Sequence, residues 1–363
     1  MNAFVVSVPP HMINVINLIQ QNGLCNNDLY VVPTMKNSAQ LARALKETGL
    51  FHDVVLLPDI SITYPVTVKK AMTIANSRFR VFRALRGKVY DKVYYCMDGW
   101  YANSIIYHGL KKLCKNAEHS LIENGINAYF RPYQDKPWYL RAFVNALGMT
   151  CMDGRFVDKL YVYEPDMMCV EQPGTIEVLP KLEVGNPKLV TVLNRVFGYC
   201  DSNNEIKNKK YVIMEQGPFA VDFDPQPIWE KVIGMLDPAE TIVKAHPRQR
   251  NSRLANLGVA ECRDFTIPWE VYLANMDVSD KVIFSIFSTA CIAPKLILGL
   301  EPRVVMLYKL LPVDYHFLGK GVVEFVEKVG GAYKDKSKFF VPESFEELEN
   351  YLKNEGLANG EGQ

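Results

Sequence analysis

The sequence lacks the features that define several common classes of protein. It has no run of about 18 apolar residues, so it contains no candidate membrane-spanning helix. The eight cysteines form no Cys-x-x-Cys pair, which argues against structural zinc and favours a reduced, cytoplasmic protein. The formal net charge is only +1, so no overall field attracts nucleic acid. The first ten residues lack a basic segment and end in two prolines, so we expect a first strand there and not a signal peptide.

What the sequence does contain is a regular alternation of strand-like and helix-like segments. Its 363 residues, 48% of them apolar, are enough for two domains with separate cores. In the first half, strands are expected at residues 4–8, 29–32, 54–57, 92–96 and 120–122, with helices at 12–21, 39–47, 72–85 and 104–113. Such alternation predicts a parallel, doubly wound sheet.

The alternation restarts after a polar stretch at residues 201–210, which has the composition of a linker. Strands are then expected at 211–214, 241–243, 282–287 and 303–307, and Ser344 with Glu347 has capping-box spacing for a last helix. We therefore predict an N-terminal Rossmann-like, acceptor-side domain at 1–200, a linker at 201–210, a C-terminal Rossmann-like, nucleotide-binding domain at 211–342, and a helix and tail at 343–363. Two doubly wound α/β domains with an interdomain cleft make the GT-B architecture, which glycosyltransferases share with some epimerases and phosphorylases.

Polar side chains follow two of the buried strands in the second half. His246 comes shortly after the strand at 241–243, and Ser288 and Thr289 follow the strand at 282–287 at the start of a helix. In open α/β sheets the ligand lies beyond the carboxyl ends of such strands. Hydroxyls and free N–H groups at a helix start suit a phosphate, although Ser288 could equally be an ordinary N-cap. Pro294 is expected to kink this helix.

The order and spacing of three motifs resemble the bacterial lipooligosaccharide sialyltransferase family. The motifs are Glu123-Asn124-Gly125, the segment at 243–249 around His246-Pro247, and the segment at 287–290 around Ser288-Thr289. The resemblance covers nearly the whole chain, and the segment from His246 to Gln249 is its most specific part. The family usually has an acid where this chain has Asn124.

The resemblance implies a site for cytidine monophosphate (CMP) in the C-terminal domain. His246 would bind or protonate the departing phosphate, and Ser288 and Thr289 would bond its oxygens. Glu270 stands where the ribose-binding glutamate of the family falls, although a solvated Glu at a helix start is an equal alternative. The remaining donor-binding residues implied are Lys244, Pro247 and Arg248.

The base that removes the acceptor proton is expected in the loop before residue 226. Asp222 and Asp224 are both candidates, and each could instead be a solvated acid before a proline-started helix. Together they form an Asp-x-Asp, which is also a metal motif of other glycosyltransferases. The resemblance favours a reaction that needs no metal or other cofactor.

These observations predict an inverting sialyltransferase. It would transfer sialic acid from the nucleotide-sugar donor CMP-sialic acid to a terminal sugar, galactose by preference, of a bacterial surface glycolipid or capsule precursor. The alternatives are a glycosyltransferase with another nucleotide sugar and a non-catalytic nucleotide-sugar-binding module.

One basic segment suggests a location at the inner face of a membrane. Apolar residues recur at three- and four-residue spacing from Met72 through Phe79 to Leu85, which predicts an amphipathic helix. Its arginines could meet anionic lipid, although a solvated face is the more common role of such residues. They are Arg78, Arg80, Arg83 and Arg86. The sequence leaves a homodimer open.

Overall fold

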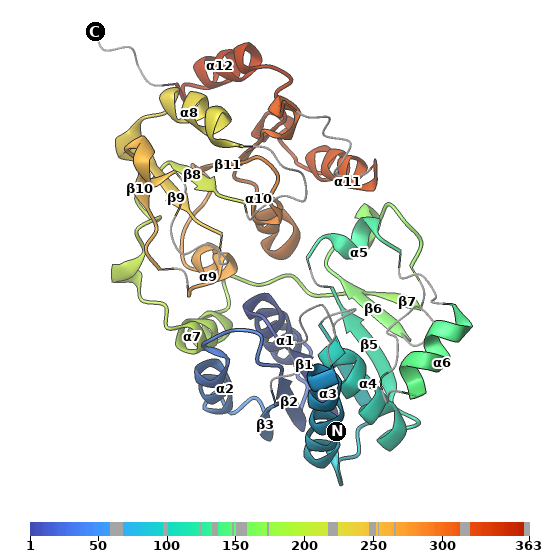
Figure 1. Cartoon of the computed structure of the whole chain (residues 1–363). Coiled ribbons are helices and arrows are strands. Elements are labelled where there is room, and N and C mark those ends of the chain that lie inside the picture. The colour runs from blue at the N-terminus through green and yellow to red at the C-terminus, as the bar shows by residue number, and fades with distance from the viewer. Residues whose placement is uncertain are drawn as a thin grey trace. The chain divides into compact units, whose positions relative to one another are not determined.

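The chain forms two compact α/β units, shown in Figure 1. The computed structural model describes residues 1–58, 68–96, 101–123, 125–132, 137–146, 149, 158–172, 174–216, 224–246, 252, 254–264, 266–312 and 320–358. Unit 1 comprises Met1–Lys181 and Asn186–Phe197, and unit 2 comprises Leu182–Gly185 and Gly198–Gln363. In this division the segment 201–210 belongs to unit 2.

Unit 1 is built on a parallel sheet of seven strands in the order β3-β2-β1-β4-β5-β6-β7. The strands are β1 (Asn2–Val6), β2 (Asn27–Val31), β3 (Asp53–Leu56), β4 (Lys92–Tyr95), β5 (Glu118–Ile122), β6 (Lys159–Val162) and β7 (Thr175–Val178). The helices are α1 (Pro9–Gln21), α2 (Ser38–Lys46), α3 (Val68–Leu85), α4 (Tyr101–Leu113), α5 (Asn127–Phe130), α6 (Trp138–Ala146) and α7 (Pro187–Phe197). Helix α7 packs with α1 and α2, while α3 packs with α4 (Figure 1).

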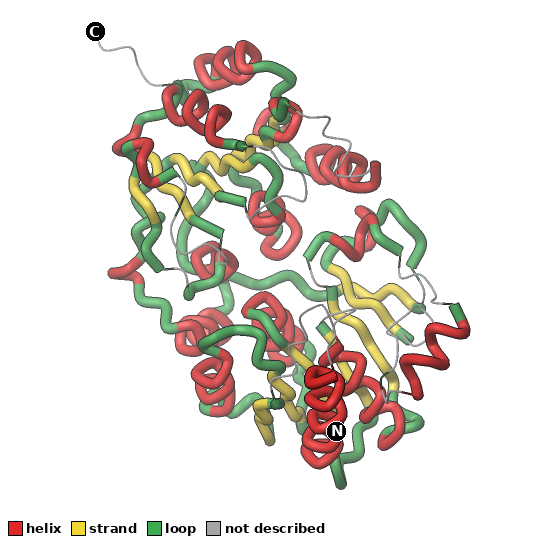
Figure 2. Tube along the Cα trace, in the orientation of Figure 1, coloured by secondary structure: helices red, strands yellow, loops and turns green. Residues whose placement is uncertain are grey.

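Unit 2 is built on a parallel sheet of six strands in the order β10-β9-β8-β11-β12-β13. The strands are β8 (Tyr211–Met214), β9 (Thr241–Lys244), β10 (Ala260–Glu261), β11 (Val282–Ser285), β12 (Arg303–Met306) and β13 (Phe339–Phe340). The helices are α8 (Gln226–Gly234), α9 (Trp269–Ala274), α10 (Thr289–Ala293), which runs into a π-helix at Pro294–Leu298, α11 (Lys320–Gly331) and α12 (Phe345–Asn354). Figure 2 shows the strands of each unit between its helices, which is the doubly wound arrangement predicted from the sequence.

Local sequence explains why the elements of unit 2 begin where they do. Strands β8, β9 and β11 are buried along their whole length, as expected of short apolar runs in a parallel sheet. The predicted cap of the last helix is confirmed: the Ser344 hydroxyl accepts a hydrogen bond from the N–H of Glu347 (3.1 Å). The helix that starts at Thr289 changes from α to π geometry at Pro294, which cannot donate a backbone hydrogen bond.

Helix α3 exists as predicted, but only the last part of its predicted apolar stripe is buried. Met72 and Phe79 are 69% and 75% exposed, whereas Val81 and Leu85 are completely buried. Leu85 packs against α4 at Gly109, which has no side chain; a Cβ added at Gly109 would lie 2.8 Å from Leu85 Cδ1. The end of α3 therefore packs closely on α4, whereas Met72 and Phe79, earlier in the helix, lie on the surface.

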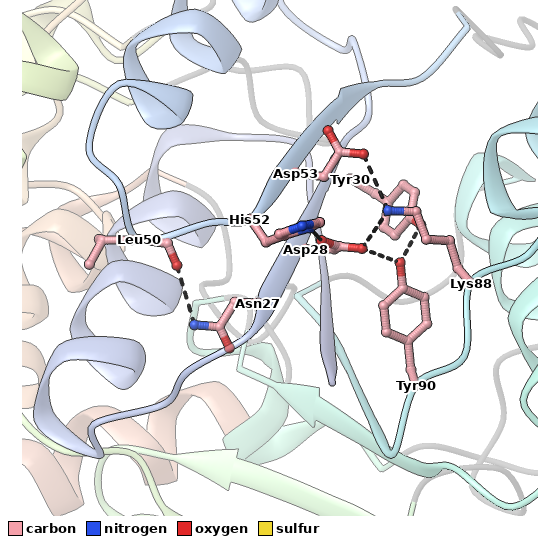
Figure 3. Close-up of polar contacts among 8 residues, drawn as sticks. All are labelled: Asn27, Asp28, Tyr30, Leu50, His52, Asp53, Lys88 and Tyr90. Atoms are coloured by element: carbon pink, nitrogen blue, oxygen red, sulfur yellow. Dashed lines mark hydrogen bonds and ion pairs between the residues drawn. The ribbon is translucent and has the colours of Figure 1, made fainter.

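A buried polar cluster lies at the amino ends of β2, β3 and β4 (Figure 3). The carboxylate of Asp28 has no exposed surface, and it accepts hydrogen bonds from Lys88 Nζ (2.9 Å) and the Tyr90 hydroxyl (2.8 Å). Burial by itself raises the pKa of Asp28, but the bonds from Lys88 and Tyr90 outweigh it and leave this pKa below its ordinary value. Lys88 also pairs with Asp53 at the start of β3 (3.3 Å). The cluster therefore holds this edge of the sheet together, at the opposite ends of the strands from the expected ligand side.

The described parts of the chain include no helix of the length and hydropathy needed to cross a membrane.

Candidate functional site

The site begins at the point where the strand order of unit 2 reverses. β8 lies between β9 and β11, and all three strands run parallel, so their carboxyl ends meet at one edge of the sheet. Two of the predicted motifs therefore come from neighbouring strands at the same edge: His246 follows β9, and Ser288 follows β11. A ligand of a doubly wound sheet binds in the crevice beyond this reversal point.

Two hydrogen bonds close the seam between β8 and β11. The Ser285 hydroxyl donates to the carbonyl of Met214 (3.0 Å), and the N–H of Phe287 donates to Gln216 Oε1 (2.9 Å). The backbone immediately before Ser288 is therefore held by a side chain from the neighbouring strand end. Gln216 carries no local signal in the sequence, and only the pairing of β8 with β11 reveals its role.

Ser288 and Thr289 form the start of α10. The Ser288 oxygen accepts a hydrogen bond from the N–H of Ala290 (3.2 Å), so this residue is the N-cap of the helix. Its hydroxyl hydrogen can still be donated to an anion, because capping uses only the oxygen as acceptor. Ser288 is half-buried and Thr289 is exposed. The two hydroxyls are thus presented at the edge of the sheet.

Glu270 lies in the first turn of α9, which is tied to α10. The indole N–H of Trp269 donates to the carbonyl of Ala290 (2.9 Å), and this bond brings the segment with Glu270 beside the segment with Thr289. Glu270 is half-buried. Burial raises its pKa, while a hydrogen bond to its own backbone N–H and the nearby charge of Lys244 act in the opposite direction. Trp269 therefore positions this carboxyl group, a role that no local signal in the sequence indicates.

Lys244 is buried at the end of β9 and is engaged within the protein. Its Nζ donates to the carbonyl of Ile267 (3.3 Å) and lies 4.8 Å from the centroid of the Tyr272 ring. Burial lowers the pKa of Lys244, and the charges around it, which include that of Glu270, only partly offset this effect. These contacts hold the loop before α9 against β9, so Lys244 supports the position of Glu270.

Of the other site residues predicted in unit 2, His246 and Asp224 are described by the structure. His246 is half-buried two residues beyond β9. Asp224 is exposed, and its Oδ1 accepts a hydrogen bond from the N–H of Gln226 (3.1 Å) at the start of α8. Asp222, Pro247 and Arg248 lie outside the described residues. Among the described residues no group of three or more His, Cys, Asp or Glu side chains could hold a metal ion.

In unit 1 the upstream motif places one carboxyl group in the protein interior. Glu123 directly follows β5 and is 3% exposed. Its Oε2 accepts hydrogen bonds from the Tyr129 hydroxyl (2.5 Å) and the N–H of Tyr163 (2.9 Å). Burial raises the pKa of Glu123 to about 7 despite these two bonds, which lower it. A carboxyl group with such a pKa changes its protonation state near neutral pH.

The surroundings of Glu123 extend the network to α1. The Tyr163 hydroxyl donates to Asn14 Oδ1 (2.6 Å), and Asn14 Nδ2 donates to the Glu123 carbonyl (3.3 Å). Gly125 has a φ of 66°, which confirms the sharp turn expected of this glycine. Asn124 lies outside the described residues. Because Asn14 and Tyr163 are far from Glu123 in the sequence, no local signal could have identified them.

The fold defined by these two units is GT-B. The glycotransferase of kitacinnamycin is similar to this chain with a TM-score of 0.50 and 12% identity, over 97% of this chain and 89% of that one. A UDP-GlcNAc 2-epimerase from Neisseria meningitidis, solved with UDP-GlcNAc, is similar with a TM-score of 0.50 and 12% identity, over 98% of this chain and 91% of that one. At such identities the likeness shows the fold alone. No curated protein sequence matches the chain.

The sequence family is narrower than the fold. Residues 2–216 match the alpha-2,8-polysialyltransferase (POLYST) family, and the chain belongs to this family. It is therefore a sialyltransferase-type glycosyltransferase. This result supports the sialyltransferase part of the resemblance described above, while the matched family is not the lipooligosaccharide family that the motifs resemble.

Proposed function

We propose that this protein transfers sialic acid from CMP-sialic acid to the terminal sugar of a glycan, with inversion at the transferred carbon. The observation that carries the proposal is the family match over residues 2–216. The family description favours an acceptor that ends in sialic acid and a new α-2,8 linkage. Galactose, the acceptor favoured by the motif resemblance, is the second candidate, and in both cases the acceptor belongs to a surface glycolipid or capsule precursor.

In this proposal the CMP portion of the donor binds to the sheet edge of unit 2. The hydroxyls of Ser288 and Thr289 donate hydrogen bonds to the phosphate, with support from the start of α10. The carboxylate of Glu270 accepts hydrogen bonds from the two ribose hydroxyls, which is a geometry that carboxylates satisfy well. Lys244 keeps the loop that carries Glu270 in place through its bond to Ile267.

His246 acts on the leaving group. The bond between the sialyl carbon and the phosphate oxygen breaks as the acceptor hydroxyl attacks from the opposite face. Negative charge then develops on the CMP phosphate, and His246 stabilises it by donating a hydrogen bond or a proton. The two hydroxyls at the start of α10 share this charge.

The acceptor hydroxyl must lose its proton as the new bond forms. Asp222 and Asp224 are the candidates that the motif resemblance provides, and Asp224 already bonds the backbone of Gln226. Glu123 is a third candidate, because its pKa of about 7 suits a base that works near neutral pH. In the alternative role, Glu123 holds the turn at Gly125 and leaves the chemistry to an aspartate.

The test is a thermal-shift comparison of the full chain with CMP, UDP and GDP. A ligand that binds only the folded state at about 100 times its Kd stabilises the protein by about 2.7 kcal/mol. We expect CMP to raise the Tm, and UDP and GDP to leave it nearly unchanged. Replacing Ser288 and Thr289 with alanine is expected to remove most of the CMP shift, whereas Ser202→Ala, on an exposed serine of unit 2, is the matched control.

Stabilisation by UDP but not by CMP would contradict the proposed donor and favour a glycosyltransferase with another nucleotide sugar. A protein that is stabilised by CMP but never releases CMP from CMP-sialic acid when acceptor is added would be a non-catalytic nucleotide-sugar-binding module.

A further inference from the structure

Helix α6 exposes aromatic side chains that a water-soluble surface normally avoids. It has no buried residue, and Trp138, Tyr139 and Phe143 are 74%, 63% and 63% exposed. Leu140 is also exposed on this helix. Three aromatic rings on a helix of nine residues form an apolar patch, and such patches mark interaction surfaces.

The orientation of α6 is the reverse of an ordinary surface helix. The less exposed residues of the helix are Arg141 and Val144, so a charged side chain lies on the more covered side. Tyr139 and Phe143 are four residues apart and share one face, and this face is exposed. A surface helix usually packs its apolar face inward and shows its charges to water. The exposed side of α6 therefore suits an apolar environment outside the protein.

Unit 1 as a whole is basic and exposes large apolar side chains, whereas unit 2 is acidic and exposes few of them. Unit 1 holds 22 Lys and Arg against 15 Asp and Glu, a formal charge of +7, whereas unit 2 holds 19 against 25, a formal charge of −6. The near-neutral charge of the whole chain conceals this difference. Among the large apolar side chains that are exposed in the described parts of the chain, all except Val184 belong to unit 1.

Helix α3 exposes basic and apolar side chains on the same side. Phe79 and Arg83 recur at helical spacing from Met72, and Arg86 follows directly after the helix. All four are exposed, as is Arg80. Arg78, by contrast, is half-buried, and its charge lowers the pKa of His108 after the larger effect of burial and the effect of Lys112. The exposed side of α3 is therefore basic and apolar, and it carries no acidic residue.

We propose that unit 1 docks on an anionic lipid bilayer, with the aromatic side of α6 inserted among the headgroups. Trp and Tyr prefer the membrane–water interface because an apolar ring and a polar group can each find their own environment there. Basic side chains near the surface add attraction to anionic lipid. A second copy of the chain is the less favourable occupant, because it would bring two units of +7 together. This inference does not depend on the proposed donor or acceptor.

The experiment is co-sedimentation of the full chain with phosphatidylcholine vesicles that contain or lack phosphatidylglycerol. We expect binding to the anionic vesicles that weakens as salt is added. Replacing Trp138, Tyr139 and Phe143 with serine is expected to lower the partition coefficient on the order of tenfold or more. Transfer to a water-soluble acceptor should be unchanged, and Val184→Ser in unit 2 is the matched control.

A charge-reversal series keeps the test decisive if the serine variant fails to fold. Replacing Arg80, Arg83 and Arg86 with glutamate is expected to weaken vesicle binding severalfold. The same replacement of three exposed lysines of unit 2 should leave vesicle binding unchanged. These control positions are Lys207, Lys334 and Lys336. The tryptophan fluorescence should move to shorter wavelength on binding. Trp138→Phe should remove that shift, whereas Trp100→Phe should leave it in place; Trp229 and Trp269 are already buried.

Equal binding of wild type and the serine variant to anionic vesicles would overturn the proposal, as would binding that does not depend on the anionic lipid. A dimer that forms without vesicles and is lost in the serine variant, with no vesicle binding, would assign α6 to a second copy instead.

Discussion

Replacing His246 with alanine is expected to lower the rate of sialyl transfer by about 10²–10⁴-fold, the usual contribution of a positioned acid or base. In the proposed reaction this imidazole stabilises the charge that develops on the departing CMP phosphate. The loss should appear in kcat, because that charge is absent from bound donor and fully formed only as the bond breaks. Initial rates with CMP-sialic acid and acceptor, at saturating concentrations of both, measure this effect.

Two comparisons separate catalysis from folding. His52 contacts Asp28 at the amino ends of the strands of unit 1, away from the expected ligand side. His52→Ala should therefore leave turnover nearly unchanged. The Tm of His246→Ala should lie close to that of the wild type, because His246 is only half-buried beyond the end of β9. A His246→Ala protein that keeps near-full turnover would remove this residue from the reaction.

Replacing Glu123 with glutamine is expected to lower acceptor turnover more than it weakens CMP binding. Glu123 belongs to unit 1, whereas the residues proposed to contact CMP belong to unit 2. If Glu123 is the base, the loss should reach about 10²-fold or more, and the wild-type rate should rise as the pH passes about 7. Calorimetry with CMP and initial rates across pH 5–9 (a range of about two units on each side of the pKa) measure the two quantities.

The same substitution makes a prediction about stability. Burial raises the pKa of Glu123 to about 7, above the value of about 4.5 in the unfolded chain, so the folded state binds the proton more tightly. The contribution to stability is therefore complete below about pH 4.5 and is lost as the pH rises through about 7, by about 3 kcal/mol in all. Glu123→Gln should be free of this loss, whereas Glu171→Gln, on an exposed carboxylate of unit 1, should behave as the wild type.

Equal losses of CMP affinity and turnover in Glu123→Gln would instead place Glu123 in the nucleotide site. The division of labour between the two units would then be wrong.

The sequence predicts the architecture well because its strongest signals are local. Alternation of short apolar runs with amphipathic segments predicts a doubly wound fold, and Ser344 caps α12 as its spacing from Glu347 indicates. The amphipathic helix α7 escaped prediction although Pro187 starts it and Leu189 and Leu193 share its buried face, so a signal was present. Strand β13 has only two residues and carries too little pattern to be recognised.

Local sequence signals do not predict which part of α3 is buried or that Glu123 is buried. Apolar spacing places Met72, Phe79 and Leu85 on one side of the helix, but only Leu85 is buried, where it packs against Gly109 of α4. The sequence places Glu123 in a loop, yet this residue is buried and accepts a hydrogen bond from the N–H of Tyr163, which follows the neighbouring strand β6 and lies 40 positions later. Contacts of this kind depend on the topology of the sheet, which no short stretch of sequence contains.

The most direct test of the proposed function is a transfer assay with the full chain, CMP-sialic acid and an acceptor that ends in α-2,8-linked sialic acid. Mass spectrometry of the acceptor and chromatography of the nucleotide follow the two products together. We expect the acceptor to gain sialic acid residues one at a time, with one CMP released for each, and His246→Ala to form almost no product. No elongation of this acceptor or of one that ends in galactose, with CMP-sialic acid left intact, would contradict the assignment as a CMP-sialic acid-dependent sialyltransferase.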